Sequence, residues 1–300
     1  MAKQNDRGEL AITRLRSAPL PAAAGPRGEE AGRVRGQPIA FAPQSPTVSA
    51  LTRKLAARTP LSSGELGILD MLCDDTRSIA ANRDIVTEGY KYDALAVMRE
   101  GFAIRYRVLR DGRRQILNVV LPGDVIGFPG CFFETALYSI TALTSTTVSS
   151  IPFSRLFQLF GEYPRIGAAI FWLFSHEAAM YAERLVGIGQ RSAVERLAHL
   201  LLELLTRLQV IGLADERSFR MPLTQEQIGD ILGLTGVHVS RTMRQLRDDG
   251  FVIAEGQVLT IKDLNAISAL ADFERTYLSH FRMNDALAPD EVGRLALTGA

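Results

Sequence analysis

The chain has 300 residues, of which 47% are hydrophobic and 22% are charged, and its formal net charge is +1. This composition is typical of a globular protein with about two domains, and the small net charge means that any nucleic-acid binding must come from a local basic patch. No apolar run approaches the roughly 20 residues that span a bilayer, and the N-terminus lacks a signal-peptide core. Two cysteines, Cys73 and Cys131, are too few for a disulfide framework or a cysteine-ligated iron–sulfur cluster within one chain. We expect a cytoplasmic protein without cofactor or metal.

Residues 1–46 differ in composition from the rest of the chain. They contain six of the thirteen prolines, seven Lys or Arg against four Asp or Glu, and no apolar periodicity. We expect this tail to be disordered. Its weak basic excess would either help non-specific DNA contact or have no function, and the second interpretation is favoured because so small an excess is easily screened.

The next segments predict helices and then many short strands. Residues 47–75 have amphipathic helical spacing, whereas from about 78 to 153 the pattern changes to period two. Candidate strands lie at 94–98, 102–109, 115–121, 139–143 and 146–151, with turns at Asp111-Gly112 and Pro122-Gly123-Asp124. This pattern predicts a small β-sandwich or jelly roll.

Residues 164–209 are predicted to be helical in two parts. The first part starts after Pro164 and carries Ile170, Leu173 and other apolar residues, which form either core or a seam for a second subunit. Gly187 and Gly189 are expected to interrupt it. A capping box at Ser192 and Glu195 starts the second part, whose leucine stripe is expected to pack against the C-terminal module. We predict that replacing Ile170 or Leu173 by Asp breaks a dimer formed along this helix, because a charge in an apolar seam is strongly unfavourable.

Residues 222–253 have the pattern of a helix-turn-helix. Thr224 and Gln227 form a capping box, Gly233 ends the first helix, and Thr235 caps a second helix with three arginines and no acid up to Arg247. An ordinary pair of packed helices with a solvated basic face is the alternative. Two short strands around a Glu255-Gly256 turn follow, and the combination is typical of a winged helix. We therefore predict a recognition helix over 235–247 that enters the major groove.

The order of these segments resembles the Crp/Fnr family of transcription regulators over roughly residues 60–275. The matching motifs are Gly101, the run Leu121-Pro122-Gly123-Asp124-Val125-Ile126-Gly127, the connector from Ile188 to Ala198, and the helix-turn-helix from Leu223 to Arg241. The resemblance implies an α+β fold. Its parts are a disordered tail (1–46), a β-roll sensor domain with N-terminal helices (47–163), a dimerisation helix (164–190), a winged helix-turn-helix (191–275) and a C-terminal tail (276–300).

The resemblance also implies a homodimer that reads a palindromic DNA site and acts on RNA polymerase. Arg241 matches the arginine that contacts a base, while Thr224, Gln225 and Thr235 match positions that usually hold phosphates. Val237 replaces a base-reading glutamate, and Gly236 lacks a side chain that some members use, so the half-site of well-known members should not be transferred. His238 either contacts DNA or packs at the edge of the interface. The other predicted DNA contacts are Ser240 and Arg244.

The signal that the β-roll would sense cannot be taken from the family. Cyclic-nucleotide-binding members carry a ribose-binding glutamate where this chain has Phe128, and a phosphate-binding arginine later, whereas no arginine lies between Arg114 and Arg155. A buried phosphate without a cationic partner would be costly. We therefore predict that cyclic AMP and GMP are not bound in the usual way, which calorimetry would check.

Other known effectors of the family fit no better. The tail lacks the cysteines of oxygen-sensing members, and Gly127 and Pro129 stand where haem-type members have ligands. Cys131 is either a redox or haem residue or, as favoured here, a buried structural cysteine. An unidentified small-molecule effector could instead bind a pocket lined by Phe128, Cys131, Phe132, Tyr138 and Ser139, which Phe133 would also line.

Two other classes of function compete with a transcription regulator. An enzyme is disfavoured because no catalytic triad, phosphate-binding loop or carboxylate pair stands out in the sequence. A sensor module whose winged helix contacts protein instead of DNA would be distinguished by its lack of salt-dependent duplex binding.

Overall fold

The computed structural model describes residues 49–57, 59, 61–127 and 132–278. The predicted tail at 1–46 and most of the one at 276–300 therefore lie outside the described residues. Helix α2 (Ala50–Ala56) is capped by the Ser49 hydroxyl, and α3 (Ser63–Leu72) begins at a capping box formed by Ser62 and Glu65. The helical segment predicted over 47–75 is thus divided into two helices.

A β-roll follows, built from two antiparallel four-stranded sheets. One sheet has the strand order β1 (Thr76–Ile79), β8 (Thr146–Pro152), β3 (Ala94–Glu100) and β6 (Val125–Ile126). The other has the order β2 (Asp84–Val86), β7 (Ser139–Ala142), β4 (Ala103–Val108) and β5 (Arg114–Val120). The five predicted strands are present to within about two residues. Between the sheets lie fully buried apolar side chains that include Met98, Ile126, Ile140 and Val148.

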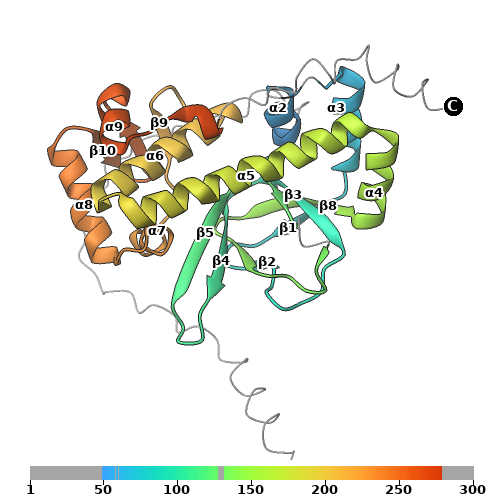
Figure 1. The fold of residues 1–300 in the computed structure, drawn as a ribbon, viewed down its shortest axis with the longest axis horizontal. Helices are drawn as coiled ribbons and strands as arrows, with labels where there is room; N and C mark the ends of the chain where they lie inside the picture. The colour runs from blue at the N-terminus through green and yellow to red at the C-terminus, as the bar shows by residue number, and fades with distance from the viewer. Residues whose placement is uncertain (1–48, 58, 60, 128–131, 279–300) are drawn as a thin grey trace, which may run out of the picture. The chain divides into compact units, whose positions relative to one another are not determined.

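Three helices connect the β-roll to the C-terminal module: α4 (Phe153–Glu162), α5 (Pro164–Gln190) and α6 (Ala193–Val210). Figure 1 shows α5 crossing the β-roll, with α6 and α8 toward one end and α3 and α4 toward the other. The predicted break at Gly187 and Gly189 is wrong, because α5 continues through both glycines to Gln190. A single glycine costs a helix only about 1 kcal/mol relative to alanine, and here the helix continues past both.

Helix α6 begins at the predicted capping box, in which Glu195 accepts from the Ser192 amide and Ser192 from the Glu195 amide. The leucines of its predicted stripe are all at most 1% exposed, and they pack against the C-terminal module as expected. They are Leu197, Leu200, Leu201, Leu204, Leu205 and Leu208. Within the described residues, none of the helices combines the length and hydropathy that crossing a membrane requires.

The C-terminal module is a winged helix-turn-helix. It contains β9 (Ser218–Arg220), α7 (Gln225–Leu232), α8 (Gly236–Asp248), β10 (Val252–Glu255), β11 (Val258–Ile261), α9 (Leu264–Ala271) and the 3₁₀ helix η2 (Arg275–Leu278). The predicted hairpin is β10–β11, and β9, which was not predicted, adds a third strand beside β11. Leu278 is 1% exposed within the core of the module, so the predicted boundary at residue 275 is too early.

Candidate DNA interface

The two helices of the helix-turn-helix begin at the predicted caps. The Thr224 hydroxyl accepts a hydrogen bond from the Gln227 amide at 3.2 Å, and the Gln227 side chain accepts from the Thr224 amide at 2.9 Å. The Thr235 hydroxyl accepts from the His238 amide at 3.2 Å at the start of α8. These bonds satisfy amides that a helix leaves without partners in its first turn.

Two glycines allow α7 and α8 to approach each other closely. Gly233 ends α7 at a φ of 67°, where a side chain would be strained. A Cβ at Gly229 would lie 2.4 Å from the Leu234 carbonyl oxygen, so any larger residue would displace the turn. From α6, Arg196 donates to the Leu232 carbonyl at 3.0 Å and fixes the end of α7. The end of α7 is therefore fixed both by the tight turn into α8 and by Arg196 of α6.

Helix α8 divides into a core face and an outer face. Val239, Thr242 and Leu246 are buried, and Met243 is half-buried. The predicted DNA contacts of this helix lie on the outer face. Val237, Arg241 and Arg244 are exposed there, and Gly236, His238 and Ser240 are half-buried. These residues therefore lie away from the core of the module, as helical periodicity predicted.

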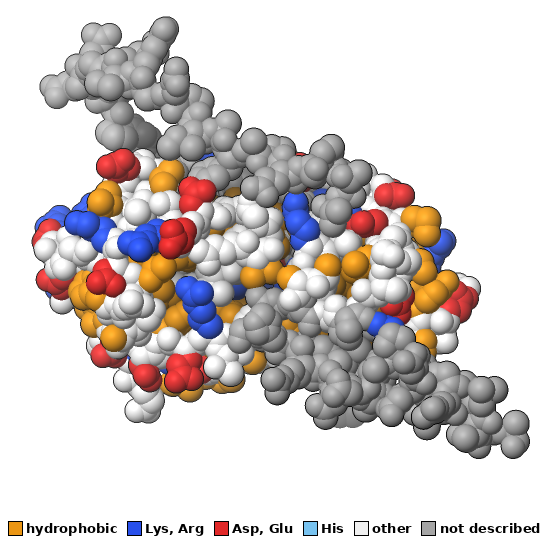
Figure 2. All heavy atoms as spheres, turned by 90° about the horizontal axis from the view of Figure 1, so that it is seen from above, with side chains coloured by type: hydrophobic (Ala, Val, Ile, Leu, Met, Phe, Trp, Pro, Cys, Tyr) orange, Lys and Arg blue, Asp and Glu red, His pale blue; other side chains and the backbone are white. Residues whose placement is uncertain are grey.

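Charge on this part of the surface is mixed. Figure 2 shows basic and acidic side chains interspersed at its left end, where Figure 1 places the C-terminal module. Asp248 and Asp249 directly follow the three arginines of α8. The positive charge of α8 therefore lies in its middle and C-terminal half, at Arg241, Arg244 and Arg247, directly before these two acids.

Thr224, Gln225 and Thr235 lie at the first turns of α7 and α8, and all three are exposed. The N-terminus of a helix carries partial positive charge and free amides, which suits it to phosphate oxygens. These positions agree with the phosphate contacts that the family resemblance implies.

Helix α5 exposes an apolar stripe that does not pack within the subunit. Phe171 is 69% exposed and Leu185 is 72% exposed, and between them the exposed positions are the small residues Ser175, Ala178 and Ala182. These five positions follow each other at intervals of three or four residues, so they share one face of the helix. We call them the α5 seam. Such a face is suited to close packing against a second copy of the helix.

Of the two alternatives that the sequence left open for Ile170 and Leu173, the structure shows core, so the predicted effect of aspartate on a dimer does not hold there. Ile170 and Leu173 are each only 5% exposed, and they pack against Leu51, Leu95 and other buried residues of the β-roll and its helices. Aspartate at either position would therefore disrupt the subunit itself. Periodicity alone could not separate the two apolar faces, because α5 is apolar on both.

Three of the five residues predicted to line a pocket in the β-roll, Phe132, Tyr138 and Ser139, belong to the described part of the chain. Phe128 and Cys131 lie outside the described residues. Phe132 is 64% exposed and its ring contacts that of Phe157, and Phe133 is also exposed. Ser139 is buried, but its hydroxyl accepts from the Glu88 amide at 3.0 Å.

Tyr138 lies beside an arginine that sequence reasoning missed. Arg105 on β4 is 2% exposed, and its guanidinium carbon lies 4.5 Å from the centre of the Tyr138 ring. Its Nη1 donates to Glu177 Oε1 and Tyr181 Oη on α5, both at 2.5 Å. The β-roll thus has a buried cation facing α5, but a carboxylate of the same chain already neutralises it. A search between Arg114 and Arg155 could not find it, because it comes from an earlier strand.

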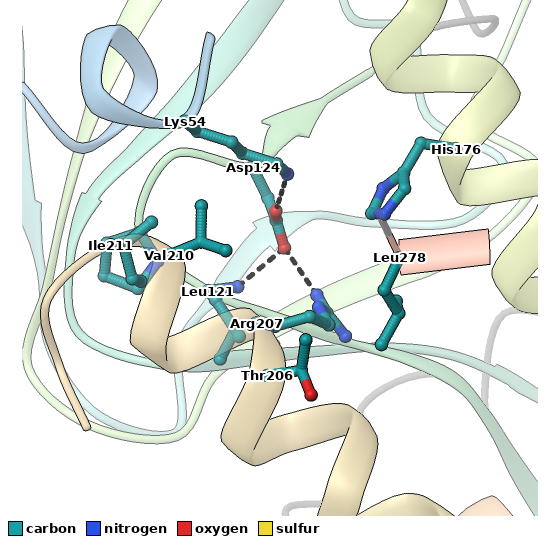
Figure 3. Close-up of a pocket in the computed structure, with 10 residues that line it drawn as sticks. Lys54, Leu121, Asp124, His176, Thr206, Arg207, Val210, Ile211 and Leu278 are labelled. Carbon is teal, nitrogen blue, oxygen red and sulfur yellow. Dashed lines mark hydrogen bonds and ion pairs between the residues drawn. The ribbon is translucent and has the colours of Figure 1, made fainter. Parts of the chain in front are cut away.

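A buried polar network connects the β-roll to α6. Figure 3 shows Asp124, which follows the Pro122-Gly123 turn, accepting from Lys54 at 2.6 Å, Arg207 at 2.8 Å and the Leu121 amide at 2.9 Å. Asp124, Lys54 and Arg207 line a hollow of about 350 Å³. Burial by itself would raise the pKa of Asp124, but Lys54 and then Arg207 outweigh it and lower the pKa to about 2.

Arg207 extends this network in two further directions. It donates to the Val119 carbonyl at 2.7 Å and the Asn118 side chain at 3.1 Å, both on β5, and to Glu203 at 3.1 Å on its own helix. Arg184 on α5 pairs with Glu203 at 3.1 Å. The β-roll, α5 and α6 are therefore joined through Arg207 and its partner Glu203.

The β4–β5 hairpin contacts the helix-turn-helix directly. Arg114 at the start of β5 pairs with Asp230 on α7 at 2.7 Å, and the Gln115 side chain donates to the Asp230 carbonyl at 2.6 Å. Since α7 packs against α8, the β-roll directly supports the orientation of α8.

The similarity to known proteins covers both halves of this arrangement. Residues 76–163 match the model of the cyclic nucleotide-binding domain, and residues 195–270 match that of the Crp-like helix-turn-helix domain. The chain is 30% identical over 216 residues to the anaerobic regulatory protein of Pasteurella multocida, covering 72% of this chain and 79% of that protein. It is also 30% identical to electron transport regulator A of Shewanella oneidensis, covering 70% and 84%. The chain belongs to the Crp/Fnr family.

Solved structures agree with this assignment. FixK2 from Bradyrhizobium japonicum superposes with a TM-score of 0.59 at 26% identity, covering 65% of this chain and 96% of that one. A Crp/Fnr-family regulator from Thermus thermophilus shares the fold at 20% identity, with a TM-score of 0.54, 66% coverage of this chain and 99% of its own. The Crp/Fnr regulator described here is a DNA-binding transcription regulator, and the predicted α+β architecture is confirmed.

Proposed function

We propose that this Crp/Fnr regulator binds a palindromic DNA site as a homodimer, with one α8 helix in the major groove of each half-site. The observation that carries the proposal is the outer face of α8, where exposed arginines stand on a helix whose position is fixed by caps, two glycines and Arg196. Rigid presentation of a recognition helix allows its side chains to reach base edges with a defined register.

The roles of the individual residues follow from their positions. Arg241 is exposed in the middle of α8, where a bidentate contact to guanine is the commonest specific interaction. Arg244, Ser240 and His238 flank it and would contact bases or phosphates nearby. Thr224, Gln225 and Thr235 would hold phosphates at the N-termini of the two helices.

The α5 seam supplies the dimer interface in this proposal. Two recognition helices related by a twofold axis must lie about 34 Å apart to enter successive turns of the major groove on one side of DNA. Packing Phe171, Leu185 and the small residues between them against the partner's α5 would bury the apolar surface that the subunit leaves exposed.

The β-roll would transmit a signal to this dimer. We propose an effector whose binding changes the contacts of Arg105, Asp124 or Arg207, since these side chains join the β-roll to α5 and α6. Cyclic AMP remains disfavoured, because Arg105 is already paired with Glu177. The DNA-bound dimer would then act on RNA polymerase.

Titration of a labelled duplex with wild-type protein, repeated over a range of salt concentrations, tests the proposal. DNA binding should weaken steeply with salt as counterions are released, and Arg241→Ala should cost about 1–3 kcal/mol while relaxing the preference at one base position. Arg113→Ala, on the exposed β4–β5 turn, is the matched control and should bind normally. Salt-independent or absent duplex binding would favour the alternative of a protein-contact module.

A further inference from the structure

The first turn of α8 carries an apolar side chain that folding does not explain. Val237 is 82% exposed, which is more than any other exposed large hydrophobic side chain in the described part of the chain. The core face of α8 is made by other residues, Val239 and Leu246 among them. A β-branched residue also has a lower helix propensity than alanine. Neither packing within the subunit nor helix formation therefore favours a valine here.

The surroundings of Val237 indicate what it would contact. Arg241 and Arg244 follow it at intervals of four and three residues, so the three side chains form one stripe along the outer face. The stripe has two guanidinium groups and ends, toward the helix N-terminus, in two methyl groups. The N-terminal residues of a recognition helix are those that approach base edges.

The chemistry of the major groove leaves one suitable partner for these methyl groups. Adenine, guanine and cytosine present hydrogen-bond donors and acceptors there, which valine cannot satisfy, whereas thymine also presents a 5-methyl group. We propose that Val237 reads the 5-methyl group of one thymine in each half-site, near the base that Arg241 contacts. This inference rests on the proposed function, because α8 must first enter the groove.

The contact should change the affinity for DNA by a measurable factor. Burying one methyl-sized apolar group corresponds to about a fourfold change in affinity for one half-site and about fifteenfold for both. The same geometry disfavours cytosine at that position, since the valine side chain cannot accept a hydrogen bond from the cytosine amino group.

The test uses full-length protein and a duplex selected from a random library. Each thymine of the half-site is replaced in turn by deoxyuridine, which keeps the base pair but lacks the 5-methyl group. We expect one thymine whose replacement weakens binding about fourfold, and we expect that loss to disappear in Val237→Ala. At the same position, 5-methylcytosine should bind better than cytosine, because it restores the methyl group.

Three further variants separate the methyl contact from other effects. Val108→Ala makes the same change at an exposed valine of the β-roll hairpin and should keep the deoxyuridine penalty. Val237→Thr retains the shape with one methyl group and should keep part of it. Arg241→Ala should lose its guanine preference and still show the penalty.

Two results would overturn the inference while leaving the proposed function intact. One is a wild-type protein that binds its duplex but is insensitive to deoxyuridine at every thymine. The other is a penalty that is equally large in Val237→Ala. Failure of the wild-type protein to enrich any duplex would instead overturn the proposed function, and this inference with it.

Discussion

Asp124→Asn is the substitution that most directly tests the connection between the β-roll and α6, the helix that packs against the C-terminal module. The carboxylate is 14% exposed and accepts hydrogen bonds from Lys54, Arg207 and the Leu121 amide. Asparagine keeps the size of the side chain but removes its charge. Two buried cations then lose an anionic partner, although Arg207 retains Glu203.

The magnitude follows from the lowered pKa. A shift from 3.8 to about 2 corresponds to about 2 kcal/mol of folding free energy, since each pKa unit is worth about 1.4 kcal/mol. Because the folded-state pKa lies below the unfolded one, this contribution is complete above about pH 4 and is lost as the pH falls through 2. Leaving buried cations without their partner adds to the cost, so we expect a total of about 2–5 kcal/mol at pH 7.

Urea denaturation at a fixed protein concentration measures this cost. Asp111→Asn is the matched control, because Asp111 also pairs with an arginine, Arg113, but on the exposed hairpin turn. We expect the control to unfold like the wild type, and the double variant Asp124→Asn/Arg207→Met to recover part of the loss. Equal stability of the two Asp→Asn variants would refute the reasoning, as would a double variant whose loss is the sum of the two single losses.

The remaining predictions concern the dimer, the hairpin and the response to pH. Leu185→Asp should give folded monomers by light scattering, whereas the same change at buried Ile170 should prevent folding; a dimeric Leu185→Asp would show that the seam lies elsewhere. Arg114→Glu should lower stability by up to about 1 kcal/mol through loss of its half-exposed ion pair with α7, and hydrogen exchange of α7 should rise in it but not in Arg113→Glu. Burial lowers the pKa of His199 to about 4, below the unfolded 6.5, so stability should fall as the pH drops from 6.5 to 4. His199→Gln should show a shallower fall, and an unchanged pH profile would contradict this.

The sequence predicted those parts of the fold that short-range signals determine. Each of these signals depends on residues within a few positions of one another. They are the caps at Thr224, Thr235 and Ser192, the turn at Gly233 and the wing hairpin. The outer face of α8 followed from helical periodicity in the same way. By contrast, β1 is largely exposed and β2 has only three residues, so neither has an alternating pattern long enough to recognise.

Long-range contacts were not predictable from these signals. Arg207 meets Asp124 across 83 positions of sequence, and Arg105 meets Glu177 across 72. Both arginines look like ordinary members of a strand or helix until the fold brings them to buried carboxylates. The sequence could not decide between core and seam for Ile170 and Leu173 for a related reason, because only the position of the β-roll shows which apolar face of α5 is covered.

Selection of bound duplexes from a random library, with purified full-length protein and no added ligand, tests the central claim most directly. The account predicts a palindromic motif whose half-sites are centred about one helical turn, or 10 base pairs, apart, with a thymine at a fixed place in each half. Enrichment of a motif without twofold symmetry would contradict the dimer, and no enrichment, even after addition of cell extract to supply an effector, would contradict DNA reading by α8.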